Sequence, residues 1–96
     1  MRKYEIMYII HPSLDEAQTK EVVEKYNGII TADGSKVLET KDWGLRNLAY
    51  EINKLNKGHY MILKVEASNE AISEFDRLSL IDNNIIRHIV INEDEQ

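Results

Sequence analysis

The alternation of strand-like and helix-like segments is the feature that most constrains how this chain folds. Residues 3–10 and 59–67 carry apolar side chains at every second position, which predicts strands. Residues 14–33 and 69–80 instead repeat apolar side chains at helical spacing. With a strand predicted over 35–55 and another over 85–91, the order is strand, helix, strand, strand, helix, strand.

Polar residues mark where the two helices begin. Ser13 with Glu16 three residues later is typical of a capping box, and Ser68 is a good N-cap for the second helix. Gly34 is the expected terminator of the first helix. We expect the second helix to bury a stripe made of Ile72, Phe75 and Leu78, with Ser79 or Leu80 flanking it.

The segment 35–55 changes character in its middle. Trp43-Gly44 interrupts the alternation of side chains, which predicts a β-bulge or a bend. Tyr50 falls on the same parity as Leu48 and Ile52, so its simplest interpretation is a core residue. The polar stretch 53–58 predicts the turn of a hairpin that joins this strand to the next.

These elements predict an α+β protein with a ferredoxin-like β-α-β-β-α-β sandwich. Right-handed crossovers place both helices on one face of a four-stranded antiparallel sheet, with the first and third strands in the centre. Ninety-six residues suffice for one core, so we expect one ferredoxin-like domain over residues 1–92 and a short, frayed acidic tail over 93–96.

The other face of this sheet has no helix to cover it. Alternation places four apolar side chains there among charged neighbours, which is more apolar surface than a solvated face needs. We therefore expect a partner protein to dock on the open face and on the edge of the second strand. The predicted partner-binding residues are Met7, Ile9, Tyr60 and Ile62.

Charge is distributed unevenly along the chain. The formal net charge is −5, yet residues 36–64 hold six basic and three acidic side chains. The acidic excess falls on the predicted helices and on the tail. Because salt screens exposed charges beyond about 10 Å, one surface can be positive on an acidic protein.

Several kinds of chemistry have no support in the sequence. The chain has no Cys, and its three His residues lack the spacing of a metal site. The apolar runs are too short for a signal peptide or a membrane span. We expect a cytoplasmic protein with no catalytic residues, no metal site, no cofactor and no small-molecule substrate.

Three segments together resemble one protein family. "MRKYEIMYIIHP", "KDWGLRNLAYEINKLNKGHYMILKVEA" and "DNNIIRHIVI" are similar to the bacterial ribosomal small-subunit protein six family. The resemblance implies a ferredoxin-like fold and no enzymatic activity. It also implies a structural role in the ribosome, where the protein binds the central domain of small-subunit rRNA together with ribosomal protein eighteen during assembly.

The resemblance also selects candidate RNA-binding residues. Arg46 matches the family's motif, and its guanidinium can contact two phosphate oxygens at once. Arg2 and Arg87 match as well, and they form a small basic site if they share an edge of the molecule. Lys3 and Asn47 are expected to help, although Asn47 stands where many relatives carry a second arginine, and Glu51 replaces a common proline.

Two alternatives from other classes remain open on the residues alone. One is a ferredoxin-like ligand-binding or dimerisation module that makes no RNA contact. The other is a small enzyme of acylphosphatase-like fold.

Overall fold

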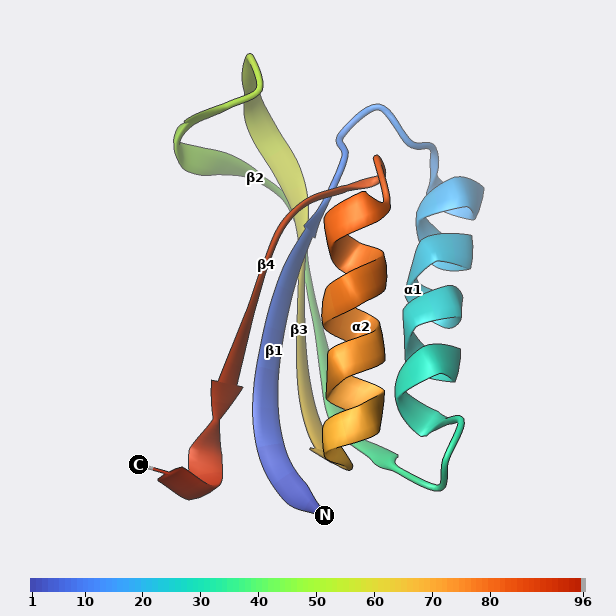
Figure 1. Cartoon of the computed structure of the whole chain (residues 1–96). Coiled ribbons are helices and arrows are strands. Elements are labelled where there is room, and N and C mark those ends of the chain that lie inside the picture. Colours follow the sequence, from blue (N-terminus) through green and yellow to red (C-terminus); the bar gives the residue numbers. More distant parts are fainter. Residues whose placement is uncertain (96) are drawn as a thin grey trace.

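The computed structural model describes residues 1–95 and confirms the predicted order of elements (Figure 1). A final single turn of 3-10 helix, η1, was not expected. The elements are β1 (Arg2–Ile10), α1 (Glu16–Thr31), β2 (Lys36–Ile52), β3 (Leu55–Ala67), α2 (Asn69–Ile81), β4 (Ile85–Asn92) and η1 (Glu93–Glu95).

The four strands form one antiparallel sheet in the order β2-β3-β1-β4. β3 and β1 therefore lie in the centre, and β2 and β4 are the edges, as predicted. Figure 1 shows both helices side by side on one face of the sheet, while the β2–β3 hairpin extends past the end of β1 and bends away from them. The fold is the predicted ferredoxin-like sandwich.

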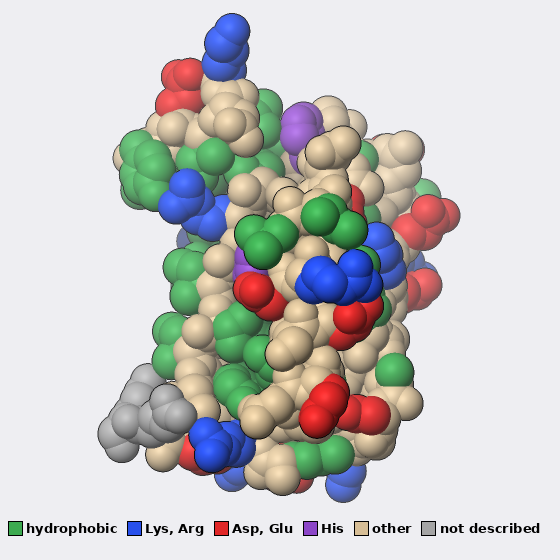
Figure 2. Space-filling view, in the orientation of Figure 1, with side chains coloured by type: hydrophobic (Ala, Val, Ile, Leu, Met, Phe, Trp, Pro, Cys, Tyr) green, Lys and Arg blue, Asp and Glu red, His purple; other side chains and the backbone are tan. Residues whose placement is uncertain are grey.

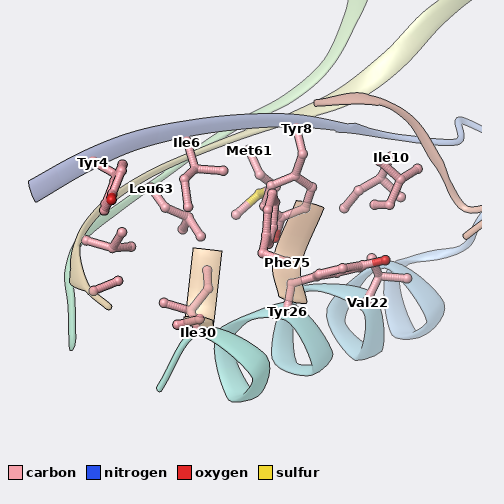
Figure 3. Close-up of a cluster of buried hydrophobic side chains, with 14 residues drawn as sticks. Tyr4, Ile6, Tyr8, Ile10, Val22, Tyr26, Ile30, Met61, Leu63 and Phe75 are labelled. Atoms are coloured by element: carbon pink, nitrogen blue, oxygen red, sulfur yellow. The ribbon is translucent and has the colours of Figure 1, made fainter. Parts of the chain in front are cut away.

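The core lies between the helices and the sheet, where alternation along β1 directs its even-numbered side chains (Figure 3). Tyr8, Tyr26 and Phe75 are fully buried and meet at its centre. Their ring centroids are 5.4 to 5.9 Å apart, with tilted or edge-on planes. This is the favourable geometry for aromatic pairs, and it joins α1, α2 and β1 at one point.

The two helices correct two details of the sequence prediction, the N-cap of α1 and the buried stripe of α2. Asp15, not Ser13, is the N-cap of α1: its carboxylate accepts from the backbone N–H of Gln18, whose side chain returns the bond. A carboxylate at this position also suits the positive end of the helix dipole. Ser68 caps α2 as predicted. The fully buried stripe of α2, however, is Ala71, Phe75 and Ser79, with Ile72 and Leu78 only partly buried.

The hairpin is longer than predicted because its turn is tighter. Only Asn53 and Lys54 form the turn, with φ of 50° and 66°, and β3 begins at once at Leu55. Positive φ at both central residues is the signature of the two-residue turn that matches strand twist. The predicted bulge is present, since the register shifts between Asp42 and Gly44, and Gly44 has a φ of 72°.

Tyr50 is the clearest error of the sequence prediction. It is 60% exposed rather than buried in the core. The regular pairing of β2 with β3 is interrupted between Asn47 and Ile52. The alternation of side chains from Leu48 to Ile52 therefore does not predict which face of the sheet Tyr50 lies on. Tyr50 instead lies in the part of the hairpin that extends beyond the core.

Residues 93–95 return to the sheet rather than fray. The backbone N–H of Lys3 donates to Oδ2 of Asp94 at 3.0 Å, which ties η1 to the first residues of β1. The last residue of the predicted acidic tail, Gln96, lies outside the described residues.

Candidate nucleic-acid interface

Arg46 follows the bulge of β2 and is held in place by its own strand. Its Nε donates to the carbonyl oxygen of Trp43 at 3.0 Å, and its guanidinium carbon lies 5.0 Å from the centre of the Trp43 ring. The Trp43 ring and carbonyl restrict the Arg46 side chain. The hydrogen bond to the carbonyl uses Nε and leaves the two terminal amino groups of the guanidinium out. Such a preordered guanidinium can bind a phosphate with less loss of side-chain entropy.

Lys57 joins Arg46 and Asn47 in one shallow hollow. The hollow is lined by Leu45, Arg46, Asn47 and Lys57, and Lys57 lies directly across the hairpin from Asn47. Sequence reasoning missed Lys57 because it placed this residue in a turn. The pairing register was the missing information, since it brings two cationic side chains and an amide together.

Arg87 connects the far edge of the sheet to the hairpin. Its Nη1 donates to the hydroxyl of Tyr50 at 2.9 Å, and its guanidinium carbon lies 5.6 Å from the centre of that ring. Tyr50 therefore positions an arginine, a role that the sequence did not indicate. The contact spans from β2 to β4, which are opposite edges of the sheet, because the hairpin bends over the open face.

Arg46 and Arg87 lie at the same end of the sheet. Arg87 pairs with Ile9, Ile9 with Tyr60, and Tyr60 with Gly44, two residues before Arg46. Among the described residues neither guanidinium forms a salt bridge, whereas Arg77 on α2 is bound to Glu74 at 2.5 Å. Within the described part of the chain, these two arginines contact rings and neutral oxygens, and with Lys57 they make this end of the sheet basic.

Arg2 and Lys3 lie at the opposite end of β1. Arg2 pairs with Ala67, whereas Arg87 is aligned with Ile9. Seven residues of strand separate the two positions, which corresponds to about 23 Å. Arg2 and Arg87 therefore do not form the single small basic site that a shared edge would give.

The predicted partner-binding residues are less accessible than expected. Ile9 and Ile62 are only 3% and 9% exposed, and Met7 and Tyr60 are half-buried. Part of the cover comes from Gly58, which lies so close to the Ile9 side chain that any larger residue would collide with it. The open face is thus partly closed by its own hairpin.

Exposed apolar side chains occur instead on the two edge strands. Figure 2 shows hydrophobic groups along the β4 margin and around the hairpin, with basic side chains beside them. Sequence reasoning missed the residues on β2 because register shifts in that strand interrupt the alternation of its side chains. On the edge strands the exposed residues are Leu38, Trp43, Leu45 and Tyr50 on β2, and Ile89 and Ile91 on β4; Met1 and, at the end of α2, Leu80 and Ile81 are exposed as well.

Two of the carboxylates with a lowered pKa, Asp33 and Asp82, lie on the helix side and serve the fold. Hydrogen bonds from Ser35 and Ser68 lower the pKa of Asp33 at the end of α1. Burial opposes ionisation of Asp82, but the Tyr26 hydroxyl at 2.7 Å and Lys25 at 3.2 Å outweigh it and lower its pKa. Each carboxylate joins elements that are distant in the chain, which is a structural role.

Two further observations concern residues 1–95 only. No group of three or more His, Cys, Asp or Glu side chains is arranged to hold a metal ion. None of the helices in this part of the chain is long and apolar enough to cross a membrane.

Comparison with known proteins decides the family. The model of the family described as Ribosomal protein S6 matches residues 3–92. The chain belongs to the ribosomal protein S6 family. Ribosomal protein S6 is a structural, non-enzymatic component of the small ribosomal subunit, which sets aside the enzyme alternative and places the chain in the ribosome of the cytoplasm.

A solved structure supports the same assignment. The crystal structure of 30S ribosomal protein S6 from Thermotoga maritima superposes with a TM-score of 0.89 at 28% sequence identity. The match covers 98% of this chain and 89% of that one. The ferredoxin-like topology is therefore shared with an S6 protein over nearly the full length of both chains.

Proposed function

We propose that this chain binds the backbone of small-subunit rRNA through the hairpin end of its sheet. In this proposal it acts in the central domain, together with ribosomal protein eighteen, during assembly of the subunit. The observation that supports it most is the placement of Arg46 and Arg87. They lie at one end of the sheet, each ordered by an aromatic ring and bound to no carboxylate among the described residues.

Phosphate recognition suits this surface better than base stacking. Trp43 and Tyr50 are engaged by arginines. Of the two central strands, β1 presents Met7 and Ile9 on the open face, and β3 adds the single half-buried ring of Tyr60. Proteins that stack bases on a bare sheet use aromatic residues in its central strands. Arginine contacts to phosphate fix the position of an RNA without reading its sequence.

A second protein is part of the proposal because this chain alone is acidic. Its net charge of −5 opposes the approach of a polyanion at long range, although the hairpin end is locally positive. A basic partner beside that end removes this opposition. Four other residues are proposed to add contacts to the RNA. Asn47 and Lys57 would do so from the hollow, and Arg2 and Lys3 from the far end of β1.

The test compares RNA binding after loss of an arginine at the hairpin end with RNA binding after loss of an arginine that is paired with a carboxylate on a helix. Binding of a central-domain rRNA fragment is measured across salt concentrations, with and without ribosomal protein eighteen, for wild type, Arg46→Ala and Arg87→Ala. Each loss should weaken partner-assisted binding about tenfold and reduce the salt slope by about one. Arg77→Ala is the matched control, because Arg77 is exposed but already paired with Glu74.

Two outcomes contradict the proposal at different levels. If wild type binds RNA with no salt slope and no dependence on the partner, the proposed function is wrong. If Arg46→Ala and Arg87→Ala both bind as tightly as Arg77→Ala, the chain binds RNA through another surface.

A further inference from the structure

A single carboxylate oxygen holds the bulge of β2 in place. Oδ1 of Asp42 accepts from the backbone N–H of Gly44 at 2.8 Å and lies 2.6 Å from Nε2 of His59. Because an ionised carboxylate has no proton to donate, Nε2 carries the proton and donates it to the same oxygen. The bulge is therefore fixed both from within β2 and from across the hairpin.

His59 ties this carboxylate to the centre of the sheet. It lies on β3, a central strand, where it pairs with Ile10 of β1 and Leu45 of β2. Its side chain is 22% exposed, whereas that of Asp42 is 59% exposed. A largely buried donor thus anchors a carboxylate that solvent would otherwise leave free to change rotamer.

The bulge determines where Arg46 is held. Two consecutive residues of β3 pair with Asp42 and Gly44, which are two positions apart, so Trp43 is the extra residue of the bulge. Such a residue is left out of the regular hydrogen-bond ladder. The carbonyl oxygen of Trp43 accepts from Nε of Arg46 at 3.0 Å, and its ring faces that guanidinium.

These contacts form one series from the centre of the sheet to a guanidinium. The histidine holds the carboxylate, the carboxylate holds the bulge, and the bulged tryptophan holds Arg46. Lys20 and His11 line the same cleft as Asp42, so His59 is not the only basic side chain near this carboxylate. What His59 adds is a hydrogen bond across the hairpin to the residue that begins the bulge.

We propose that Asp42 and His59 are positioning residues for RNA binding, which keep Arg46 oriented toward a phosphate without touching the RNA themselves. The inference rests on the proposed function. It gives an expectation opposite in sign to that of charge. Removing a carboxylate beside a basic surface should by charge alone strengthen binding to a polyanion. Removing the acceptor at Asp42 should instead weaken binding, because Arg46 is no longer held.

The test compares two substitutions of Asp42 that remove the same charge. Asp42→Asn keeps an oxygen acceptor for Gly44 and His59, and Asp42→Ala removes it. Binding of the central-domain rRNA fragment is measured at pH 7 with ribosomal protein eighteen present, and circular dichroism checks the fold of each variant. Asp42→Ala should bind RNA about fivefold more weakly than Asp42→Asn, which is the effect of about one ordinary hydrogen bond.

The same comparison without Arg46 separates positioning from a general loosening of the hairpin. In the Arg46→Ala chain, the two Asp42 variants should bind RNA within about twofold of each other, because the side chain that Asp42 positions is gone. A substitution that only destabilises the hairpin would weaken binding to the same degree with or without Arg46.

A second pair of variants tests the other end of the contact. His59→Phe keeps an aromatic ring on β3 but has no donor, whereas His59→Gln keeps an amide N–H. His59→Phe should bind RNA about threefold more weakly than His59→Gln. This pair decides the matter if Asp42→Ala does not fold.

The outcomes distinguish the inference from the function beneath it. If Asp42→Ala binds RNA as tightly as Asp42→Asn, or if their difference persists in the Arg46→Ala chain, the positioning role is wrong. Equal binding by His59→Phe and His59→Gln overturns it as well. If wild type binds RNA with no salt slope and no dependence on the partner, the proposed function fails, and the inference fails with it.

Discussion

The helix-covered part of the sheet and the β2–β3 hairpin differ in what holds their side chains in place. Under the helices, Tyr8, Tyr26 and Phe75 are fully buried and contact one another from three elements. In the hairpin, Trp43 and Tyr50 are about half exposed and contact arginines. Burial excludes water from the first set, whereas the second keeps its polar and charged partners at the surface.

This difference separates stability from recognition. Removing apolar area from water is the main source of folding free energy, and most of that area lies under the helices. The hairpin extends beyond this core, so its side chains are free to be selected for contact with other molecules. Substitutions in the two regions should therefore affect different measurements.

The largest expected effect comes from the core. Phe75→Ala should lower the free energy of unfolding by about 3–5 kcal/mol, because it removes a fully buried ring and leaves a cavity. Urea denaturation followed by circular dichroism measures this loss. Arg46→Ala, in the hairpin, should change the same quantity by less than about 0.5 kcal/mol. Equal losses in the two variants would remove the contrast between the regions.

An intermediate effect should depend on pH and belong to the helix side alone. The pKa of Asp82 is lowered in the folded protein, so its ionised form stabilises the fold. That contribution is complete above the carboxylate's unfolded pKa of about 3.9 and is lost as pH falls through the lower folded pKa. Asp82→Asn should therefore cost about 1 kcal/mol at pH 7 and much less near pH 2.

A double-mutant cycle with Tyr26→Phe sharpens this prediction. Tyr26 donates to Asp82 at 2.7 Å, and burial together with this bond raises the pKa of the Tyr26 hydroxyl. The coupling free energy between the two substitutions, measured by urea unfolding, should be larger at pH 7 than near pH 2. A coupling that does not change with pH would mean that the carboxylate charge adds nothing to this contact.

The smallest effect is expected in the hairpin and should be stabilising. Lys54 has a φ of 66°, a conformation that glycine adopts without strain. Lys54→Gly creates the preferred Asn-Gly turn and should raise the free energy of unfolding by about 0.5 kcal/mol. Lys57→Gly, placed in the paired part of β3, should lower it instead. Urea midpoints of the two variants test this prediction. A lower free energy of unfolding in both would show that strain at Lys54 does not limit the stability of the protein.

The order of elements and most of the core could be predicted from the sequence. Alternation in 3–10 and 59–67, helical spacing in the two helices, and the cap at Ser68 are local patterns, and each acts through neighbours in the chain. The structure confirms the resulting four-stranded sheet and its edges. The cap of α1 was misplaced by two residues because two polar side chains, Ser13 and Asp15, both suit that position.

The candidate site depended on more distant contacts. Arg46 and Arg87 could be named from the family motif, but their common end of the sheet follows only from the register across four strands. The same register places Lys57 and Tyr50 beside these arginines and Arg2 far from Arg87.

By itself, then, the sequence determined which segments are strands and helices and which face of each is apolar, since these properties arise from side chains a few residues apart. Tertiary structure decided which cations share a surface and which apolar residues stay exposed. Those outcomes depend on how bulges shift the register of β2 and how far its hairpin bends over the sheet. Both are set by the packing of whole elements, and a local pattern does not encode them.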